Sequence, residues 1–172
     1  NLAYHFGHLS AGMHTSEDNI KVHMSGWRLR VMNQSYVHPQ RTSASIPREN
    51  IQLANINLEK IINKYWFLVG QAGSAYGGNA GSYSTGMFGL GVQSGCWHHV
   101  SIYSEVFLGA GGGGAMDTAG GLIYEPIVGA DYHLTDHFGL TAGIGKLIAV
   151  KAKMNTTTIH IGLNISWTTP VI

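Results

Sequence analysis

The sequence predicts an all-β fold, an antiparallel up-and-down transmembrane β-barrel of eight to ten strands. Three observations predict it. Charged residues make up only 11% of the 172 residues, against about 25% in ordinary soluble domains. Hydrophobic residues reach only 44%, and no apolar run approaches the roughly 20 residues that a membrane-spanning helix needs. Finally, short segments alternate between apolar and small polar residues, which is the period of a β-strand.

The clearest alternation lies near the C-terminus, between Thr158 and Trp167. One face of this segment is apolar and carries Ile159, Ile161, Leu163, Ile165 and Trp167. The other face carries His160, Gly162, Asn164 and Ser166. Segments 83–94 and 138–145 repeat the pattern with glycines opposite large apolar residues. A barrel with lipid outside and a tightly packed interior requires strands of this kind.

Nine strands are expected along the visible chain. In order, these are 2–14, 20–34, 51–61, 64–77, 83–94, 99–111, 120–134, 138–150 and 156–167. The apolar phase slips near Gly7 and near Gly26, which predicts a β-bulge at each. Segment 51–61 is the weakest strand prediction, because an amphipathic helix starting at Pro47 would also fit. Pro126 lacks an N–H for the ladder, so its strand is expected to bulge or to border a seam.

The connections and the aromatic residues are distributed in the same regular way. Shorter connections at 15–19, 62–63, 95–98 and 135–137 alternate with mostly longer ones, of which 35–50 and the Gly-rich 112–119 are the longest. Aromatic residues gather at the strand ends next to the shorter connections, namely Tyr65, Trp66, Trp97, Tyr132, Phe138 and Trp167. Tyr4, Tyr76 and Tyr83 lie near the opposite ends. Two aromatic belts are typical of a protein that crosses two membrane–water interfaces, whereas an aromatic core of a soluble sandwich is the alternative.

On these features the chain resembles the small, eight- to ten-stranded bacterial outer-membrane β-barrels. The resemblance covers nearly the whole chain and rests on pattern, with no diagnostic motif and no specific family. It departs at the C-terminus, where Trp167 is followed by Thr-Thr-Pro-Val-Ile172 and not by the terminal aromatic that such proteins usually carry. The resemblance implies a location in the bacterial outer membrane among membrane lipids, and it allows a protein partner in that membrane or in the periplasm.

The resemblance also gives an orientation and a strand count. Residues 1–172 are expected to form one barrel domain, with 35–50 as a long extracellular loop and the shorter turns in the periplasm. Because bacterial single-chain barrels have even strand numbers, nine strands imply a tenth upstream of Asn1, which would pair with the last strand. If 51–61 is a helix, eight strands remain and the first visible strand closes the barrel.

The candidate functional residues are charges on inward-facing positions. Arg28, Arg30, Glu105 and Glu125 all point inward in the predicted phase. Polar groups enclosed by lipid must find their partners inside the protein, so these four are expected to form an ion-pair network that fills a narrow lumen. A gate and a paired-carboxylate site are the alternative roles.

Other kinds of chemistry have little support in the sequence. A net charge of +1 gives no electrostatic reason to expect nucleic acid. The ten histidines show no HExxH or CxxC spacing, so neither a metal site nor a cofactor is predicted. For a lipid-modifying enzyme the sequence offers Ser101 with Glu105 and His160 with Ser166, and no catalytic residue is predicted.

The sequence therefore predicts an outer-membrane barrel with a filled or narrow lumen and a structural, anchoring or assembly role, including service as a subunit of a membrane complex. The alternatives are a lipid-modifying enzyme, a narrow channel or transporter, and a soluble lipocalin-like barrel. In a lipocalin-like barrel the apolar strand faces would point inward.

Overall fold

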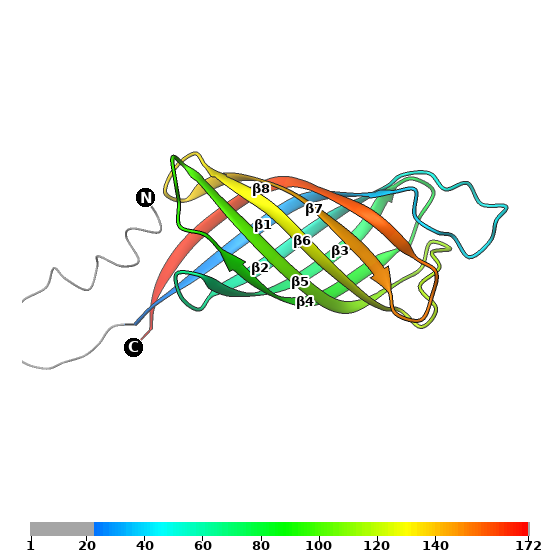
Figure 1. Ribbon diagram of the computed structural model, residues 1–172, viewed down its shortest axis with the longest axis horizontal. Helices are drawn as coiled ribbons and strands as arrows, with labels where there is room; N and C mark the ends of the chain where they lie inside the picture. The colour runs from blue at the N-terminus through cyan, green and yellow to red at the C-terminus, as the bar shows by residue number, and fades with distance from the viewer. Residues whose placement is uncertain (1–22, 172) are drawn as a thin grey trace, which may run out of the picture.

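A computed structural model of the chain shows a closed barrel of eight antiparallel strands (Figure 1). The structure describes residues 23–171, with side chains from 26 to 167. The strands are β1 (His23–Val37), β2 (Ile51–Ile61), β3 (Trp66–Gly77), β4 (Ser84–Gln93), β5 (Val100–Gly112), β6 (Leu122–His133), β7 (Phe138–Ala149) and β8 (Asn155–Val171). Among these residues no helix is long and apolar enough to cross a membrane. The predicted all-β barrel is confirmed, with eight strands.

The barrel closes between β1 and β8. Their register runs from His23 opposite Val171 to Val37 opposite Thr157 without a shift. The prediction that the last strand pairs with a strand upstream of Asn1 is therefore wrong, and so is the predicted bulge near Gly26. The predicted strand 2–14 and the turn 15–19 lie outside the described residues. Segment 51–61 is a strand, and within the described residues the one shift of register lies between this strand and β3, at Gln52 and Leu53.

Pro126 interrupts one ladder, as its missing N–H requires. It is paired with Val106 of β5, but the β6–β7 pairing stops after Tyr124 and resumes at Ile127. The strands continue side by side on both sides of this gap, so the barrel stays closed here.

The two ends of the barrel differ in their connections (Figure 1). One end carries the segments 38–50, 78–83, 113–121 and 150–154, and we call it the long-loop end. The other end carries 62–65, 94–99 and 134–137 together with the start of β1 and the end of β8, and we call it the short-turn end. The alternation of connections read from the sequence corresponds to these two ends.

Large apolar side chains cover the outside of the barrel. Along β5, Ile102, Val106 and Leu108 point outward and are more than half exposed, and Phe88 on β4 is 81% exposed. Apolar side chains at alternate positions of the other strands also point outward, for example Leu68, Val128, Ile144 and Leu163, which are 49% to 58% exposed. This is the reverse of a lipocalin-like barrel, in which such faces would line the interior.

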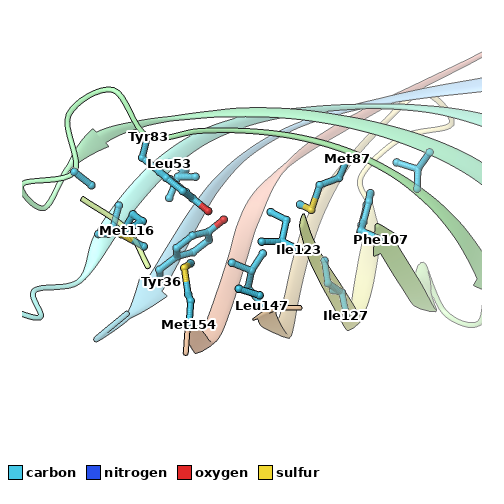
Figure 2. Packing of buried hydrophobic residues seen from close by; sticks show 14 of the residues in the cluster. Tyr36, Leu53, Tyr83, Met87, Phe107, Met116, Ile123, Ile127, Leu147 and Met154 are labelled. Carbon is cyan, nitrogen blue, oxygen red and sulfur yellow. The ribbon is translucent and has the colours of Figure 1, made fainter. Parts of the chain in front are cut away.

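An apolar cluster fills the interior toward the long-loop end (Figure 2). Its members include Tyr36, Leu53, Ile123 and Leu147 from the strands, with Tyr83, Met116 and Met154 from the loops. All are 4% exposed or less. Large inward side chains fit because glycines face them. A Cβ on Gly91 would lie 2.2 Å from the Phe67 ring, and one on Gly129 would lie 2.4 Å from the Tyr103 ring.

Candidate functional site in the barrel interior

Five charged side chains meet inside the barrel toward the short-turn end. They are Arg28 and Arg30 on β1, Glu59 on β2, Glu105 on β5 and Asp131 on β6, and we call them the ionic cluster. Each occupies an inward position because the residues on either side of it in the strand point outward. The sheet curvature brings together groups that are up to 103 residues apart in the chain.

The two arginines hold three carboxylates. Arg28 donates from Nε to Glu59 Oε2 at 2.6 Å, and its Nη1 lies 3.2 Å from Asp131 Oδ2. Arg30 Nη1 lies 2.7 Å from Glu59 Oε1 and also contacts Glu105, while Nη2 lies 3.1 Å from Asp131 Oδ2. All of these side chains are at most 6% exposed. Buried charges are tolerated only when they are paired in this way.

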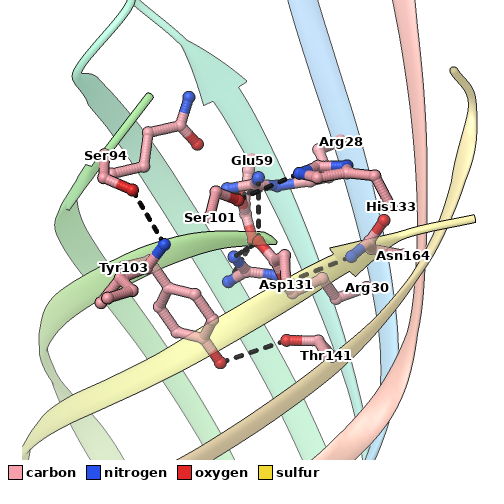
Figure 3. A network of polar contacts seen from close by, with 12 residues as sticks. Arg28, Arg30, Glu59, Ser94, Ser101, Tyr103, Asp131, His133, Thr141 and Asn164 are labelled. Carbon is pink, nitrogen blue, oxygen red and sulfur yellow. Dashed lines mark hydrogen bonds and ion pairs between the residues drawn. The ribbon is translucent and has the colours of Figure 1, made fainter. Parts of the chain in front are cut away.

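Aromatic and amide groups complete the cluster (Figure 3). The Arg30 guanidinium lies 4.1 Å from the Tyr103 ring centre and 5.8 Å from that of Phe67. Tyr103 is hydrogen-bonded to Thr141 of β7 at 3.2 Å, and Asn164 of β8 donates to Asp131 at 3.2 Å. Contacts therefore run across the lumen between opposite walls, and they fill it at this level.

Glu125 lies in a second polar cluster, which is closer to the long-loop end than the ionic cluster is. Its Oε1 accepts from Gln34 at 2.8 Å and from Thr158 at 2.5 Å, and it lies 3.1 Å from His160 Nε2. Gln34 accepts in turn from Asn55. All five side chains are at most 1% exposed. The charge of Glu125 thus meets a histidine and neutral donors, and no arginine among the described residues.

The structure places three of the four predicted network residues together. Arg28, Arg30 and Glu105 share the ionic cluster, whereas Glu125 is separate. Sequence reasoning left Glu59 and Asp131 out of the network, although both lie on the inward face of their strands. For Asp131 the signal was present, since it alternates with the outward Ala130 and Tyr132.

Two polar side chains on the inner wall, one on β2 and one on β3, have no hydrogen-bond partner among the described residues. Asn57 and Gln71 are paired across the two strands. Both side chains are buried, and their oxygen and nitrogen atoms make no hydrogen bond with any described residue. They differ in this respect from Asn164, which donates to Asp131.

Arg41 ties the loops together over the long-loop end. Its guanidinium donates to the carbonyls of Gly78, Asn79 and Gly114, at 2.7, 3.3 and 2.9 Å. Gln40 accepts from the backbone N–H of Asn155 at 2.7 Å. Segment 38–50 therefore contacts the loops 78–83 and 113–121 and the first residue of β8, above the apolar cluster.

The remaining candidates for chemistry are dispersed. Ser101 Oγ lies 3.0 Å from His133 Nε2 near the short-turn end, and it is not bonded to Glu105. His160 contacts Glu125 and Thr158 and makes no hydrogen bond to Ser166. Within the described range, no group of three or more His, Cys, Asp and Glu side chains could hold a metal ion.

The predicted interface aromatics all lie outward near the short-turn end. Tyr65, Trp66, Trp97, Tyr132 and Trp167 are 38% to 75% exposed. Two lysines accompany them. Lys60 lies on the outward face of β2 beside Trp27, and Lys64 lies in the turn next to Tyr65. This end of the outer surface thus combines aromatic rings with positive charge.

Comparison with solved structures identifies the architecture. The chain has the fold of small bacterial outer-membrane β-barrels. The N-terminal barrel domain of Pseudomonas aeruginosa OprF is similar with a TM-score of 0.63 and 9% identity, over 83% of this chain and 97% of that one. Neisserial surface protein A gives 0.54 and 14%, over 83% and 96%. A designed transmembrane β-barrel gives 0.58 and 13%, over 83% and 95%.

The attachment invasion locus protein Ail of Yersinia pestis is also similar, with a TM-score of 0.54 and 14% identity over 84% of this chain and 98% of that one. No protein-family model and no curated protein matches the sequence. At these identities the comparisons establish the fold, and the role of the chain has to be argued from its own residues.

Proposed function

We propose that the protein spans the outer membrane of a Gram-negative bacterium as a closed, non-conducting barrel with a structural or anchoring role. The observation that carries this proposal is the combination of an apolar outer wall and an interior filled by bonded side chains. The fold shared with outer-membrane barrels supports the same location.

The outer wall is unsuited to water. Monomeric soluble proteins seldom expose contiguous apolar patches beyond a few hundred Å², whereas here large apolar side chains point outward from every strand. Lipid would cover this surface at no hydrophobic cost, and the closed ladder leaves no strand edge that lipid would have to solvate. The ring of aromatics at the short-turn end would lie at the level of the lipid headgroups.

The interior argues against a role in transport. A conducting pore needs a continuous polar path, but the apolar cluster around Tyr36, Tyr83 and Met154 lies between the Glu125 cluster and the long-loop end. On the other side of the Glu125 cluster, the ionic cluster links opposite walls. Eight-stranded barrels are just wide enough for side chains to fill them, and these side chains do so.

The anchoring role leaves the loops and the outer surface as the places where a partner would bind. A partner protein in the outer membrane or the periplasm is part of this proposal. In this proposal the polar clusters stabilise the barrel and carry out no reaction.

Two measurements test the proposal. Cell fractionation should recover the protein with the outer membrane, and detergent should be needed to extract it. Planar lipid bilayers containing the purified protein should show no unitary conductance, while a general porin inserted in parallel conducts. Recovery in a detergent-free soluble fraction would contradict the membrane location, and reproducible conductance steps would contradict the closed lumen.

A further inference from the structure

The outer surface at the short-turn end carries a patch of positive charge and aromatic rings on neighbouring strands. It comprises Trp27 on β1, Lys60 on β2, Lys64 and Tyr65 in the following turn, and Trp167 on β8, and we call it the Lys60 patch. These residues all lie on the outside of the barrel, at the end where the ionic cluster lies inside.

The strand register fixes the arrangement of the patch. Trp27 is paired with Lys60 on one side and with Trp167 on the other. Residues directly opposite each other in an antiparallel ladder point to the same face, and Arg28 and Glu59 next to them point inward. Trp27 therefore stands between Lys60 and Trp167 on the outer face.

Each lysine lies over an aromatic ring. Lys60 Nζ is 5.7 Å from the Trp27 ring centre, and Lys64 Nζ is 5.4 Å from the Tyr65 ring centre. These distances are within the range of cation–π attraction. The aromatic ring positions each ammonium group but does not accept conventional hydrogen bonds from its three N–H groups. These N–H groups therefore remain available to donate to a ligand.

Among the described residues, no negative charge lies beside the two lysines of the patch. Neither lysine takes part in an ion pair with a described residue. Among the described residues Asp136 is the only outward acidic side chain at this end, and it lies in the turn between β6 and β7. In the closed sheet, β8 and β1 separate that turn from β2. Over the part of the chain that the structure describes, the charge around Lys60 and Lys64 is thus positive.

We propose that the Lys60 patch binds the headgroup phosphate of an anionic phospholipid in the membrane leaflet at the short-turn end. The ammonium groups of Lys60 and Lys64 contact the phosphate, and the rings of Trp27 and Trp167 contact the glycerol and the first part of the acyl chains. Amphipathic rings settle at headgroup depth, and basic residues near an anionic surface attract it. This inference rests on the proposed membrane location.

Native mass spectrometry of the detergent-solubilised protein tests the proposal, with phosphatidylglycerol and phosphatidylcholine as the two lipids. The wild type should retain phosphatidylglycerol in preference to phosphatidylcholine. The variant Lys60→Gln/Lys64→Gln should bind phosphatidylglycerol on the order of 25-fold more weakly, at about fivefold per lysine. The variant Lys60→Arg/Lys64→Arg should keep most of the binding, because it keeps the charge.

A matched control is available at the other end of the barrel. Lys151 and Lys153 are exposed in the loop between β7 and β8, and Lys151→Gln/Lys153→Gln should leave phosphatidylglycerol retention unchanged. Equal losses in the two glutamine variants, or no preference for phosphatidylglycerol in the wild type, would overturn the proposal. If the protein still fractionates with the membrane in that case, only the lipid-binding proposal fails and the proposed location stands. Recovery in a soluble fraction would overturn both the lipid-binding proposal and the proposed location.

Discussion

Replacing Arg30 by methionine removes the guanidinium that contacts all three carboxylates of the ionic cluster. Arg28 remains, but it reaches only Glu59 and Asp131. Glu105 then has no arginine within reach, at 2% exposure. The methionine side chain fills much of the same volume, so the main effect of the substitution is an uncompensated buried charge.

The expected cost follows from that charge. Removing one partner of a buried ion pair destabilises proteins by about 3–5 kcal/mol, and we expect a loss in this range for Arg30→Met. The double variant Arg30→Met/Glu105→Gln neutralises the carboxylate that was left alone. It should therefore recover roughly 1–3 kcal/mol relative to the sum of the single variants.

Equilibrium unfolding in urea measures these differences, with the protein in lipid vesicles and tryptophan fluorescence as the signal. Arg48→Met is the matched control, because Arg48 is exposed in segment 38–50 and its loss should change the free energy of unfolding by less than about 0.5 kcal/mol. The reasoning is refuted if Arg30→Met is as stable as the control, or if the two substitutions in the cycle are strictly additive.

Three further predictions concern packing, the unpartnered wall and the loops. Gly91→Ala should lower the free energy of unfolding by about 1–3 kcal/mol, because the new Cβ would lie 2.2 Å from a buried ring. Gly86→Ala is the control and should leave the free energy of unfolding unchanged, because its Cβ would have no atom within 4 Å. Urea unfolding compares the two variants. Asn57→Leu should lower the free energy of unfolding by less than about 1 kcal/mol, whereas Asn164→Leu should lower it by about 1–3 kcal/mol because it removes the donor to the buried Asp131 Oδ1. Arg41→Ala should make segment 38–50 more sensitive to limited proteolysis while the barrel stays folded.

Each of these has a result that would count against it. If Gly91→Ala and Gly86→Ala lowered the free energy of unfolding equally, the space around each glycine would not be what limits substitution. A loss for Asn57→Leu as large as that for Asn164→Leu would mean that the Asn57 amide is bonded. Unchanged cleavage of the Arg41 variant would show that its three carbonyl contacts do not hold the loops.

The barrel was predictable because lipid-facing strands alternate, and the alternation needs only local sequence. In β8 the outward Ile161 and Leu163 and the inward His160 and Asn164 are correctly assigned by phase alone. Segment 51–61 was harder for a physical reason that the structure shows. Ile51 and Leu53 point inward into the apolar cluster, whereas farther along Ile56 and Leu58 point outward. The apolar phase therefore switches within β2, which resembles the spacing of a helix.

The partners inside the barrel were not predictable from local pattern. Which inward residues meet depends on the strand count, the closing pair and the stagger of the ladder, all of which involve distant segments. Arg28 and Asp131 come together only because β1 closes against β8 and the narrow lumen brings β6 within reach. A closing strand upstream of Asn1, as the sequence suggested, would have given different neighbours. Likewise, Glu125 shares the inward phase of Glu105 but lies at another height, beside His160.

Spin-label accessibility on the outer wall tests most directly the claim that the apolar surface faces lipid. Single cysteines at Val106, Val128 and Leu163, in a Cys96→Ser background, would carry the labels, with Ser45 in segment 38–50 as the exposed reference. In vesicles, the three wall positions should be accessible to dissolved oxygen and protected from a water-soluble nickel complex, and Ser45 should show the reverse. Nickel accessibility at the wall positions equal to that at Ser45 would contradict the account.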